Sequence, residues 1–280
     1  MNQILTFITW NPDPEIFRFG SVAVRWYGVL FALGFVVGYL ILQRMFKTEG
    51  VPIKLLDSLT TYMIIGTIIG ARLGHCLFYE PDYYLAHPLK IFAVWEGGLA
   101  SHGAAIGIII SLIVFSYVKK KPFLWAMDHV VIVTALAGFL IRMGNLMNSE
   151  IFGHITTLPW GFIFLRASNP IEAEDPRHPT QIYEALSYLL IFFYLIWYYY
   201  RKKGKPEPGY IFGMFLILVF GVRFFIEFVK EPQVGFEATM ALNMGQWLSI
   251  PFVLAGIYLV LRSKKVARSE KRNLSLRGTQ

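Results

Sequence analysis

The chain has 280 residues, of which 55% are hydrophobic and 16% are charged, and its mean hydropathy is +0.51. Because soluble globular proteins carry charge on about a quarter of their residues, this composition excludes a soluble domain and predicts an all-α protein that crosses a membrane several times. The net charge of +8 raises nucleic-acid binding as a function, but the positions of the basic residues indicate membrane orientation and no nucleic-acid partner. The single cysteine, Cys76, excludes an intramolecular disulfide framework.

Seven apolar runs are long enough to cross a hydrocarbon core, which takes about 20 helical residues. In chain order they lie at 22–43, 56–79, 98–118, 124–147, 181–200, 209–229 and 245–262. The first run is too long for the apolar part of a cleavable signal peptide, so we expect it to stay in the protein.

Most of the 26 lysines and arginines follow the odd-numbered runs. These basic segments lie at 44–54, 119–121, 201–205 and 262–277. By the positive-inside rule, the pattern predicts a cytoplasmic C-terminus and an N-terminus on the outside. The basic loops are therefore interpreted as orientation signals and not as ligand sites.

The connecting segments suggest one membrane domain over residues 1–262, followed by a basic cytoplasmic tail over 263–280. Within that domain, the proline-rich and polar segment 150–180 is predicted to be a small extracytoplasmic insertion. The aromatic segment 81–95 is predicted to lie along the water–lipid interface.

The stretch 142–153, RMGNLMNSEIFG, places polar groups at the end of an otherwise apolar run. On a helix, Arg142, Asn145 and Ser149 would share one face, close to Glu150. Such a cluster inside a membrane costs several kcal/mol unless partners satisfy it, which makes it a candidate site. The alternative is an interhelical polar clamp with a purely structural role.

The predicted helices place further polar residues at the same depth in the membrane as this cluster. At 1.5 Å per residue, Arg72, Arg142 and Arg223 all lie roughly 21 to 24 Å from the inner face. Tyr27 and His102, on helices that run the opposite way, lie about 7 Å below the outer face. Five helices are therefore expected to point polar groups into one layer near the outer leaflet.

We expect the positive charge in this layer to exceed the negative charge, because Glu150 and Glu227 are the nearest acids to the three arginines. Guanidinium groups match phosphate oxygens bidentately, so the sequence predicts an anionic ligand. At that depth it would be a phospholipid headgroup, with its acyl chains between the helices.

Each of these residues also has a structural interpretation. Arg72 could reach toward the interface, and Glu227 could pair with Arg223 one helical turn away. His102 could be a packing histidine or a general base. The remaining histidines lack metal-ligand spacing, so no metal is predicted.

Six blocks of this sequence, in order, resemble the bacterial prolipoprotein diacylglyceryl transferases, whose signature is approximately GRxGNFxNxExxG. The block that carries the signature is RMGNLMNSEIFG, at 142–153. The others are VRWYG at 24–28, WEGGLASHG at 95–103, RHPTQIYEAL at 177–186, GVRFFIEFVKEP at 221–232 and MGQWLSIP at 244–251. The chain departs from the family at Val219, where a tyrosine is frequent, and at Leu146, where an aromatic residue is usual.

The resemblance implies a seven-span, multi-pass enzyme of the bacterial cytoplasmic membrane with its active site toward the outer leaflet. Its substrates would be phosphatidylglycerol and the lipobox cysteine of a preprolipoprotein signal peptide, joined as a thioether without a cofactor, and we expect a monomer. By matching motif, His102, Arg142, Arg223 and Tyr27 are candidate catalytic residues. The candidate substrate-binding residues are Arg142, Asn145, Glu150, Gly153, Arg223 and Glu227.

A carrier or flippase for an anionic phospholipid is the alternative function, since the same arginines could bind the lipid without chemistry. A structural membrane subunit would explain the helix packing but not several charges at one depth.

Overall fold

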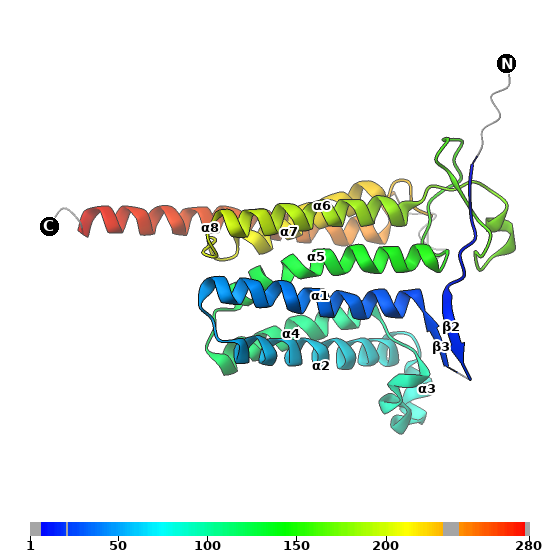
Figure 1. Ribbon diagram of the computed structural model, residues 1–280, viewed down its shortest axis with the longest axis horizontal. Helices are drawn as coiled ribbons and strands as arrows, with labels where there is room; N and C mark the ends of the chain where they lie inside the picture. The colour runs from blue at the N-terminus through cyan, green and yellow to red at the C-terminus, as the bar shows by residue number, and fades with distance from the viewer. Residues whose placement is uncertain (1–6, 21, 232–240, 278–280) are drawn as a thin grey trace, which may run out of the picture. The chain divides into compact units, whose positions relative to one another are not determined.

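The computed structural model describes residues 7–20, 22–231 and 241–277, and most of them are helical (Figure 1). The chain divides into two compact units. The first comprises Met1–Ile41 and Val130–Gln280, and the second comprises Leu42–His129.

The long helices of the described residues correspond to the seven predicted runs. They are α1 (Trp26–Glu49), α2 (Ile53–Phe78), α4 (Ser101–Lys119), α5 (Phe123–Met147), α6 (Thr180–Arg201), α7 (Tyr210–Ile226) and α8 (Met244–Arg277). Six are long and apolar enough to cross a membrane, whereas α7 has 17 residues and is a shorter apolar helix. The prediction of a polytopic, all-α membrane protein is confirmed.

Short elements connect the long helices. They are the strands β1 (Ile8–Trp10), β2 (Glu15–Phe19), β3 (Val22–Arg25) and β4 (Phe162–Phe164), the helix α3 (Pro81–Ala86), and the 3-10 turns η1 (Pro88–Phe92), η2 (Val94–Glu96) and η3 (Pro170–Ala173). Strand β2 pairs with β3 in an antiparallel ribbon, and β1 pairs with β4 in parallel. The first helix therefore begins at Trp26, because the start of the predicted run forms β3.

A small apolar core supports the segment 150–180. Its buried members are Leu146, Phe152, Phe162 and Phe164, and Trp10 packs against them. The Trp10 indole Nε1 also donates a hydrogen bond of 2.8 Å to the Leu146 carbonyl, at the last turn of α5. Residues from β1 and β4 thereby hold the end of α5 in place.

In the second unit, α2 and α4 lie side by side with their backbones in contact (Figure 1). A Cβ atom at Gly70 would lie 2.8 Å from the Gly107 Cα, and one at Gly74 would lie 2.6 Å from the Gly103 Cα. Only glycine permits such an approach, as in small-residue interfaces of membrane helices. Small residues on both helices therefore permit this close packing.

A buried polar contact in the same unit joins the end of α1 to the start of α5. The Glu49 carboxylate accepts hydrogen bonds from Trp125 Nε1 at 2.9 Å and lies 2.6 Å from His129 Nε2. His129 Nδ1 lies 2.7 Å from the Trp125 carbonyl. These partners satisfy a histidine and a carboxylate that would otherwise be costly to bury.

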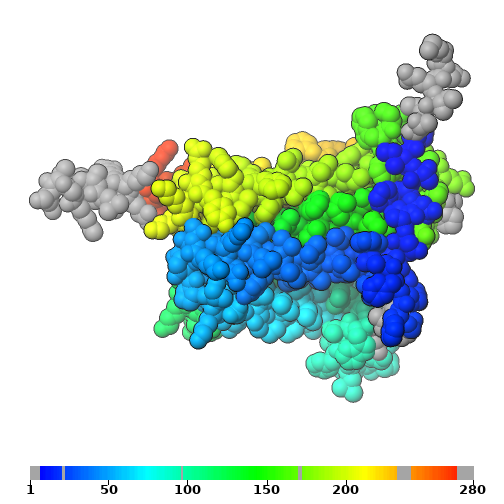
Figure 2. Space-filling view, in the orientation of Figure 1, coloured from blue at the N-terminus to red at the C-terminus, as the bar shows by residue number. Residues whose placement is uncertain are grey.

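The helices keep many large apolar side chains on their outer surfaces. Figure 2 shows the outer surfaces of α1, in blue, and of α6, in yellow-green. Exposed apolar residues on them include Val36 and Leu40 of α1, and Leu190 and Phe193 of α6. Such surfaces are stable against lipid and not against water, which agrees with a membrane-embedded chain.

Candidate functional site

The polar end of α5 forms a hydrogen-bonded chain. Arg142 Nη1 donates to Asn145 Oδ1 at 3.1 Å, and Asn145 Nδ2 donates to Glu150 Oε1 at 2.8 Å. Asn148 Nδ2 donates to the same Glu150 oxygen at 3.2 Å. The structure thus brings together Arg142, Asn145 and Glu150, as predicted.

Ser149 does not share the helical face with Arg142, so that part of the prediction is wrong. Helix α5 ends at Met147, and Ser149 and Ile151 have positive φ angles of 54° and 61°. This turn redirects the chain, and it brings Glu150 back toward Asn145 although the two residues are not on one helix.

Glu184 of α6 is the acidic partner of Arg142. The Glu184 carboxylate forms an ion pair with Arg142 Nε, and the two side chains are 1% and 15% exposed. Tyr188, one turn further along α6, is hydrogen-bonded to the same guanidinium. The expectation that Arg142 lacks an acidic partner is therefore wrong, because α6 supplies a carboxylate from a distant part of the sequence.

Lys230 lies between two carboxylates. Its Nζ is 3.5 Å from Glu184 Oε1 and 3.3 Å from Glu227 Oε1, and its side chain is only 4% exposed. A buried ammonium group is stable only when paired. Lys230 is therefore the link that joins the carboxylate of α6 to the carboxylate at the end of α7.

Glu227 completes the chain to the second arginine. Its Oε1 lies 3.6 Å from Arg223 Nε, one turn earlier, as the structural interpretation of this pair predicts. Asn243 Nδ2 donates to Glu227 Oε2 at 3.1 Å. A Cβ at Gly245 would overlap the Glu227 carboxylate, so this group sits against the first turn of α8, where a helix N-terminus favours negative charge.

A reciprocal cap begins α8 at this point. The backbone N–H of Gln246 donates a hydrogen bond to Asn243 Oδ1 at 2.9 Å. The backbone N–H of Asn243 donates one to Gln246 Oε1 at 3.1 Å. This is the geometry of a capping box. The cap fixes Asn243, and through it the orientation of Glu227.

Gly153 and the start of α6 hold the turn that carries Glu150. Gln181 Nε2 donates to the Glu150 carbonyl at 2.6 Å, and Thr180 Oγ1 donates to the Ile151 carbonyl at 2.8 Å. Gly153 forms an antiparallel bridge with Lys230, and a Cβ at this position would overlap the Val229 carbonyl. Glycine is therefore required at 153 by the close approach of two backbones.

Tyr27, in the first turn of α1, lies against α5. A Cβ at Gly144 would come within 2.8 Å of the Tyr27 ring and 3.1 Å of its Cα. Tyr27 is half-buried. The structure thus brings Tyr27 to the α5 turn that carries Arg142 and Asn145.

Arg72, in the second unit, has a structural role. Its guanidinium donates to four backbone carbonyls, those of Ile91 at 2.9 Å, Gly97 at 2.6 Å, Gly98 at 3.2 Å and Lys90 at 2.5 Å. Arg72 is 3% exposed and also stacks on Tyr84. These donors hold the segment that precedes α4.

His102 is exposed and lies in the first turn of α4, in the second unit. Two features fix this turn within that unit. The Ala100 amide donates to the Ala71 carbonyl at 2.9 Å, and Gly103 packs against the backbone of α2. His102 thus belongs to the second unit, whereas the other candidate residues belong to the first.

Outside the membrane-spanning helices, Glu231 accepts hydrogen bonds from two basic side chains. Its Oε2 lies 3.1 Å from Arg177 Nη1 and 3.0 Å from His154 Nδ1. Nearby, burial and the neighbouring His154 lower the pKa of His178, whose Nδ1 lies 3.1 Å from the Tyr183 hydroxyl. The neutral imidazole of His178 is the form that the folded state favours.

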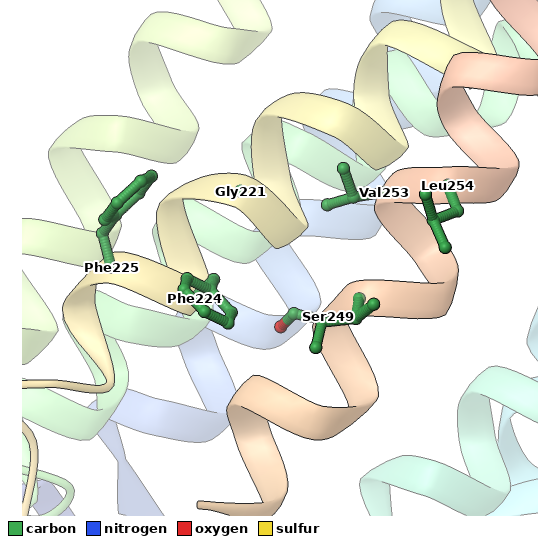
Figure 3. A pocket seen from close by; sticks show the side chains of 7 residues that line it. Gly221, Phe224, Phe225, Ser249, Val253 and Leu254 are labelled. Atoms are coloured by element: carbon green, nitrogen blue, oxygen red, sulfur yellow. The ribbon is translucent and has the colours of Figure 1, made fainter. Parts of the chain in front are cut away.

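An apolar groove of about 220 Å³ lies between α7 and α8 (Figure 3). Its lining includes Gly221, Phe224, Phe225, Ser249, Val253 and Leu254. The Ser249 hydroxyl donates to the Gly245 carbonyl at 2.6 Å, so it presents no unsatisfied donor to the groove. A Cβ at Gly221 would meet no atom within 4 Å.

The cluster of the first unit combines three basic side chains, Arg142, Arg223 and Lys230, with three carboxylates. Arg223 is its most accessible cation, at 32% exposure, and its Nε makes no hydrogen bond within the part of the chain that the structure describes. The fold and this cluster define a polytopic membrane protein in which three cations and three carboxylates form one cluster.

Comparison with known proteins identifies the family. The family model described as prolipoprotein diacylglyceryl transferase matches residues 14–262. The chain belongs to this family, as the sequence blocks predicted.

Three relatives are named phosphatidylglycerol–prolipoprotein diacylglyceryl transferase. The protein of Tolumonas auensis is 51% identical over 259 residues, which cover 91% of this chain and 97% of the relative. That of Porphyromonas gingivalis is 48% identical over 95% of this chain and 98% of its own length. That of Chloroherpeton thalassium is 44% identical over the same shares.

Sequence reasoning missed Glu184 and Lys230 as members of the site. Both lie in blocks that carry the family resemblance, at 177–186 and 221–232. The available signal was chemical: a membrane-embedded arginine requires a carboxylate, and Glu184 is an acidic residue within a predicted span.

Proposed function

We propose that this protein transfers the diacylglyceryl group of phosphatidylglycerol to the lipobox cysteine thiol of preprolipoproteins. The observation that carries the proposal is the ionic chain from Arg142 through Glu184, Lys230 and Glu227 to Arg223. It holds two guanidinium groups from different helices in one cluster. The family match and the names of the relatives support the same reaction.

In this reaction, the cysteine sulfur forms a bond to the glyceryl carbon as the bond from that carbon to the phosphate oxygen breaks. The thiol proton passes to a base, and glycerol phosphate leaves with the bonding electron pair. The developing negative charge on the leaving phosphate is the group that a pre-positioned guanidinium stabilises. No metal or diffusible cofactor is needed, because the lipid brings its own leaving group.

The geometry suggests roles for the first-unit residues. Arg223, whose Nε makes no hydrogen bond to a described residue, and Arg142 would bind the phosphate. Asn145 and Glu150 would orient the Arg142 guanidinium and the glycerol headgroup, since Arg142 donates to Asn145 and Asn145 donates to Glu150. Gly153 would hold this arrangement by letting its backbone lie against that of Val229 and Lys230. Glu227 would hold it through its ion pairs with Arg223 and Lys230.

Two further residues are assigned to the proton transfer. A thiol with a pKa near 8.5 needs a base at neutral pH, and His102 is assigned this role on its sequence motif. Tyr27, which packs on the α5 turn beside Asn145, is assigned to assist it.

The apolar groove between α7 and α8 supports a binding place for an acyl chain. Its lining is almost entirely hydrocarbon (Figure 3).

We further propose a monomer in the bacterial cytoplasmic membrane, with its site toward the outer leaflet and its C-terminus in the cytoplasm. The distribution of basic residues supports this orientation. Residues 1–262, with the insertion 150–180, would form the membrane domain, and 263–280 the cytoplasmic tail.

The test is a transfer assay in detergent micelles that contain phosphatidylglycerol and a lipobox peptide, read by gel shift and mass spectrometry. We expect a thioether-linked product from the wild type, none from Arg142→Ala, and a reduced yield from His102→Gln. Arg44→Ala, at an exposed position of α1, is the matched control and should retain wild-type yield. A folded wild type that binds the lipid but never modifies the thiol would refute the proposal in favour of the lipid carrier.

A further inference from the structure

Glu227 has three partners that compete for its carboxylate. Oε1 lies 3.6 Å from Arg223 Nε and 3.3 Å from Lys230 Nζ, and Oε2 accepts a hydrogen bond from Asn243. Its side chain is 8% exposed. A carboxylate this deeply buried requires a cation at all times.

The two cations differ in how firmly they are held. The Lys230 side chain is almost completely buried, and its backbone is fixed by the bridge to Gly153. The Arg223 side chain is about a third exposed, its pair with Glu227 is the longer one, and its Nε has no hydrogen bond to any described residue. Arg223 is therefore the cation that can leave Glu227 at the lower cost.

We propose that Lys230 is a positioning residue that keeps Glu227 paired when Arg223 turns from Glu227 to the phosphate of the incoming phospholipid. This inference rests on the proposed function, in which Arg223 binds that phosphate. It assigns to Lys230 no contact with the lipid.

The reason is the cost of an unpaired buried charge. If Arg223 were the sole cation at Glu227, phosphate binding would strand a carboxylate in a low-dielectric interior. Lys230 Nζ lies 3.3 Å from Glu227 Oε1. Glu227 therefore keeps one of its two cations when Arg223 leaves. An ammonium group suits this task, since it is a point charge that can face two carboxylates at once, here Glu184 and Glu227.

The test measures kcat and the KM for phosphatidylglycerol in mixed micelles, together with the lipid Kd by native mass spectrometry in the absence of peptide. In Lys230→Met, Glu227 must retain Arg223, so we expect KM and Kd for the lipid to rise about tenfold or more, with a smaller change in kcat. Lys230→Arg keeps the cation and should retain most of the affinity. Lys202→Met, which removes a lysine paired with Glu207 elsewhere in the same unit, is the matched control and should follow the wild type.

The decisive variant is the double substitution Lys230→Met with Glu227→Gln. It removes the carboxylate that needs a cation, so Arg223 is free and the lipid KM and Kd should fall below those of Lys230→Met. A purely structural role for Lys230, or direct phosphate binding by Lys230, predicts that the double variant binds lipid as weakly as Lys230→Met or worse. That result, or an unchanged lipid affinity in Lys230→Met, would overturn the inference.

The double variant leaves no stranded charge at this carboxylate, so it remains informative if Lys230→Met alone does not fold. The proposed function is tested separately by the wild-type protein. If the wild type gives no thioether product, the proposed reaction is refuted. The lipid Kd values of the wild type and the variants still test the role of Lys230.

Discussion

Glu184 on α6 forms a buried ion pair with Arg142 on α5, and the same carboxylate faces Lys230. A single acidic side chain thus joins the polar end of α5 to the segment that follows α7. The arginine of the family signature is held by a residue outside that signature, which has a direct consequence for mutagenesis.

We predict that Glu184→Gln destabilises the protein strongly. Removing one member of a buried pair leaves Arg142 without its carboxylate, which costs about 3 to 5 kcal/mol. Thermal unfolding in detergent, followed by intrinsic fluorescence, would measure the loss. Glu207→Gln breaks the more exposed pair with Lys202 and should cost about 1 kcal/mol or less; equal losses in the two variants would contradict the prediction.

Gly153→Ala should be destabilising, because the new methyl group would overlap the Val229 carbonyl and approach His178 Cβ at 2.8 Å. Such overpacking costs about 1 to 3 kcal/mol, and it would separate the Gly153–Lys230 bridge. Gly221→Ala, where a methyl group meets open space, is the control for stability. A Gly153→Ala protein with a wild-type unfolding midpoint would show that the two backbones can separate freely.

Gly221→Leu should alter acyl-chain selectivity, because a leucine side chain would fill the groove between α7 and α8. We expect kcat/KM for long-chain phosphatidylglycerol, relative to short-chain lipid, to fall roughly tenfold. Competition between the two lipids in one assay measures this ratio directly. Ala105→Leu, at an exposed position of α4, adds the same bulk elsewhere and should leave the ratio unchanged.

Arg72→Met should loosen the segment that leads into α4, because four backbone carbonyls lose their donor. Hydrogen exchange followed by mass spectrometry is expected to show faster exchange over 88–98. The matched control is Arg44→Met at an exposed position. Unchanged exchange over 88–98 would mean that other contacts suffice to order the segment.

Stability should fall on mild acidification in a way that depends on His178. Burial and His154 lower the pKa of His178 in the folded state, while the unfolded imidazole titrates near 6.5. Below that pH the unfolded state binds more protons, so this contribution is fully present above about pH 6.5 and is lost as pH falls toward the folded pKa.

The expected difference is small because His178 is only partly buried. The decrease in unfolding temperature between pH 7.5 and 5.5 should be smaller in His178→Asn than in the wild type. His87→Asn, at an exposed histidine, should behave as the wild type. A larger decrease in His178→Asn would reverse the sign and reject this account.

Several features could be predicted from the sequence because they depend on local patterns. Apolar length identified the seven long helices. The i, i+4 spacing of Arg223 and Glu227 anticipated their pairing. The family followed from six short blocks, since residues within a block keep their spacing whatever the tertiary fold.

Local patterns failed where the backbone leaves a helix. Ser149 has a positive φ angle, which a helical projection does not contain, and Arg72 donates to carbonyls 18 to 26 residues further along the chain. Neither feature is visible when each run is treated as an isolated helix.

The sequence by itself determined the class of protein, its helices and its family, because hydropathy and motif spacing are properties of the chain read locally. Only the tertiary structure decided which charges neutralise one another. Glu184 and Lys230 reach Arg142 and Glu227 through the packing of α5, α6 and α7, and the strength of such pairs depends on distance and burial in three dimensions.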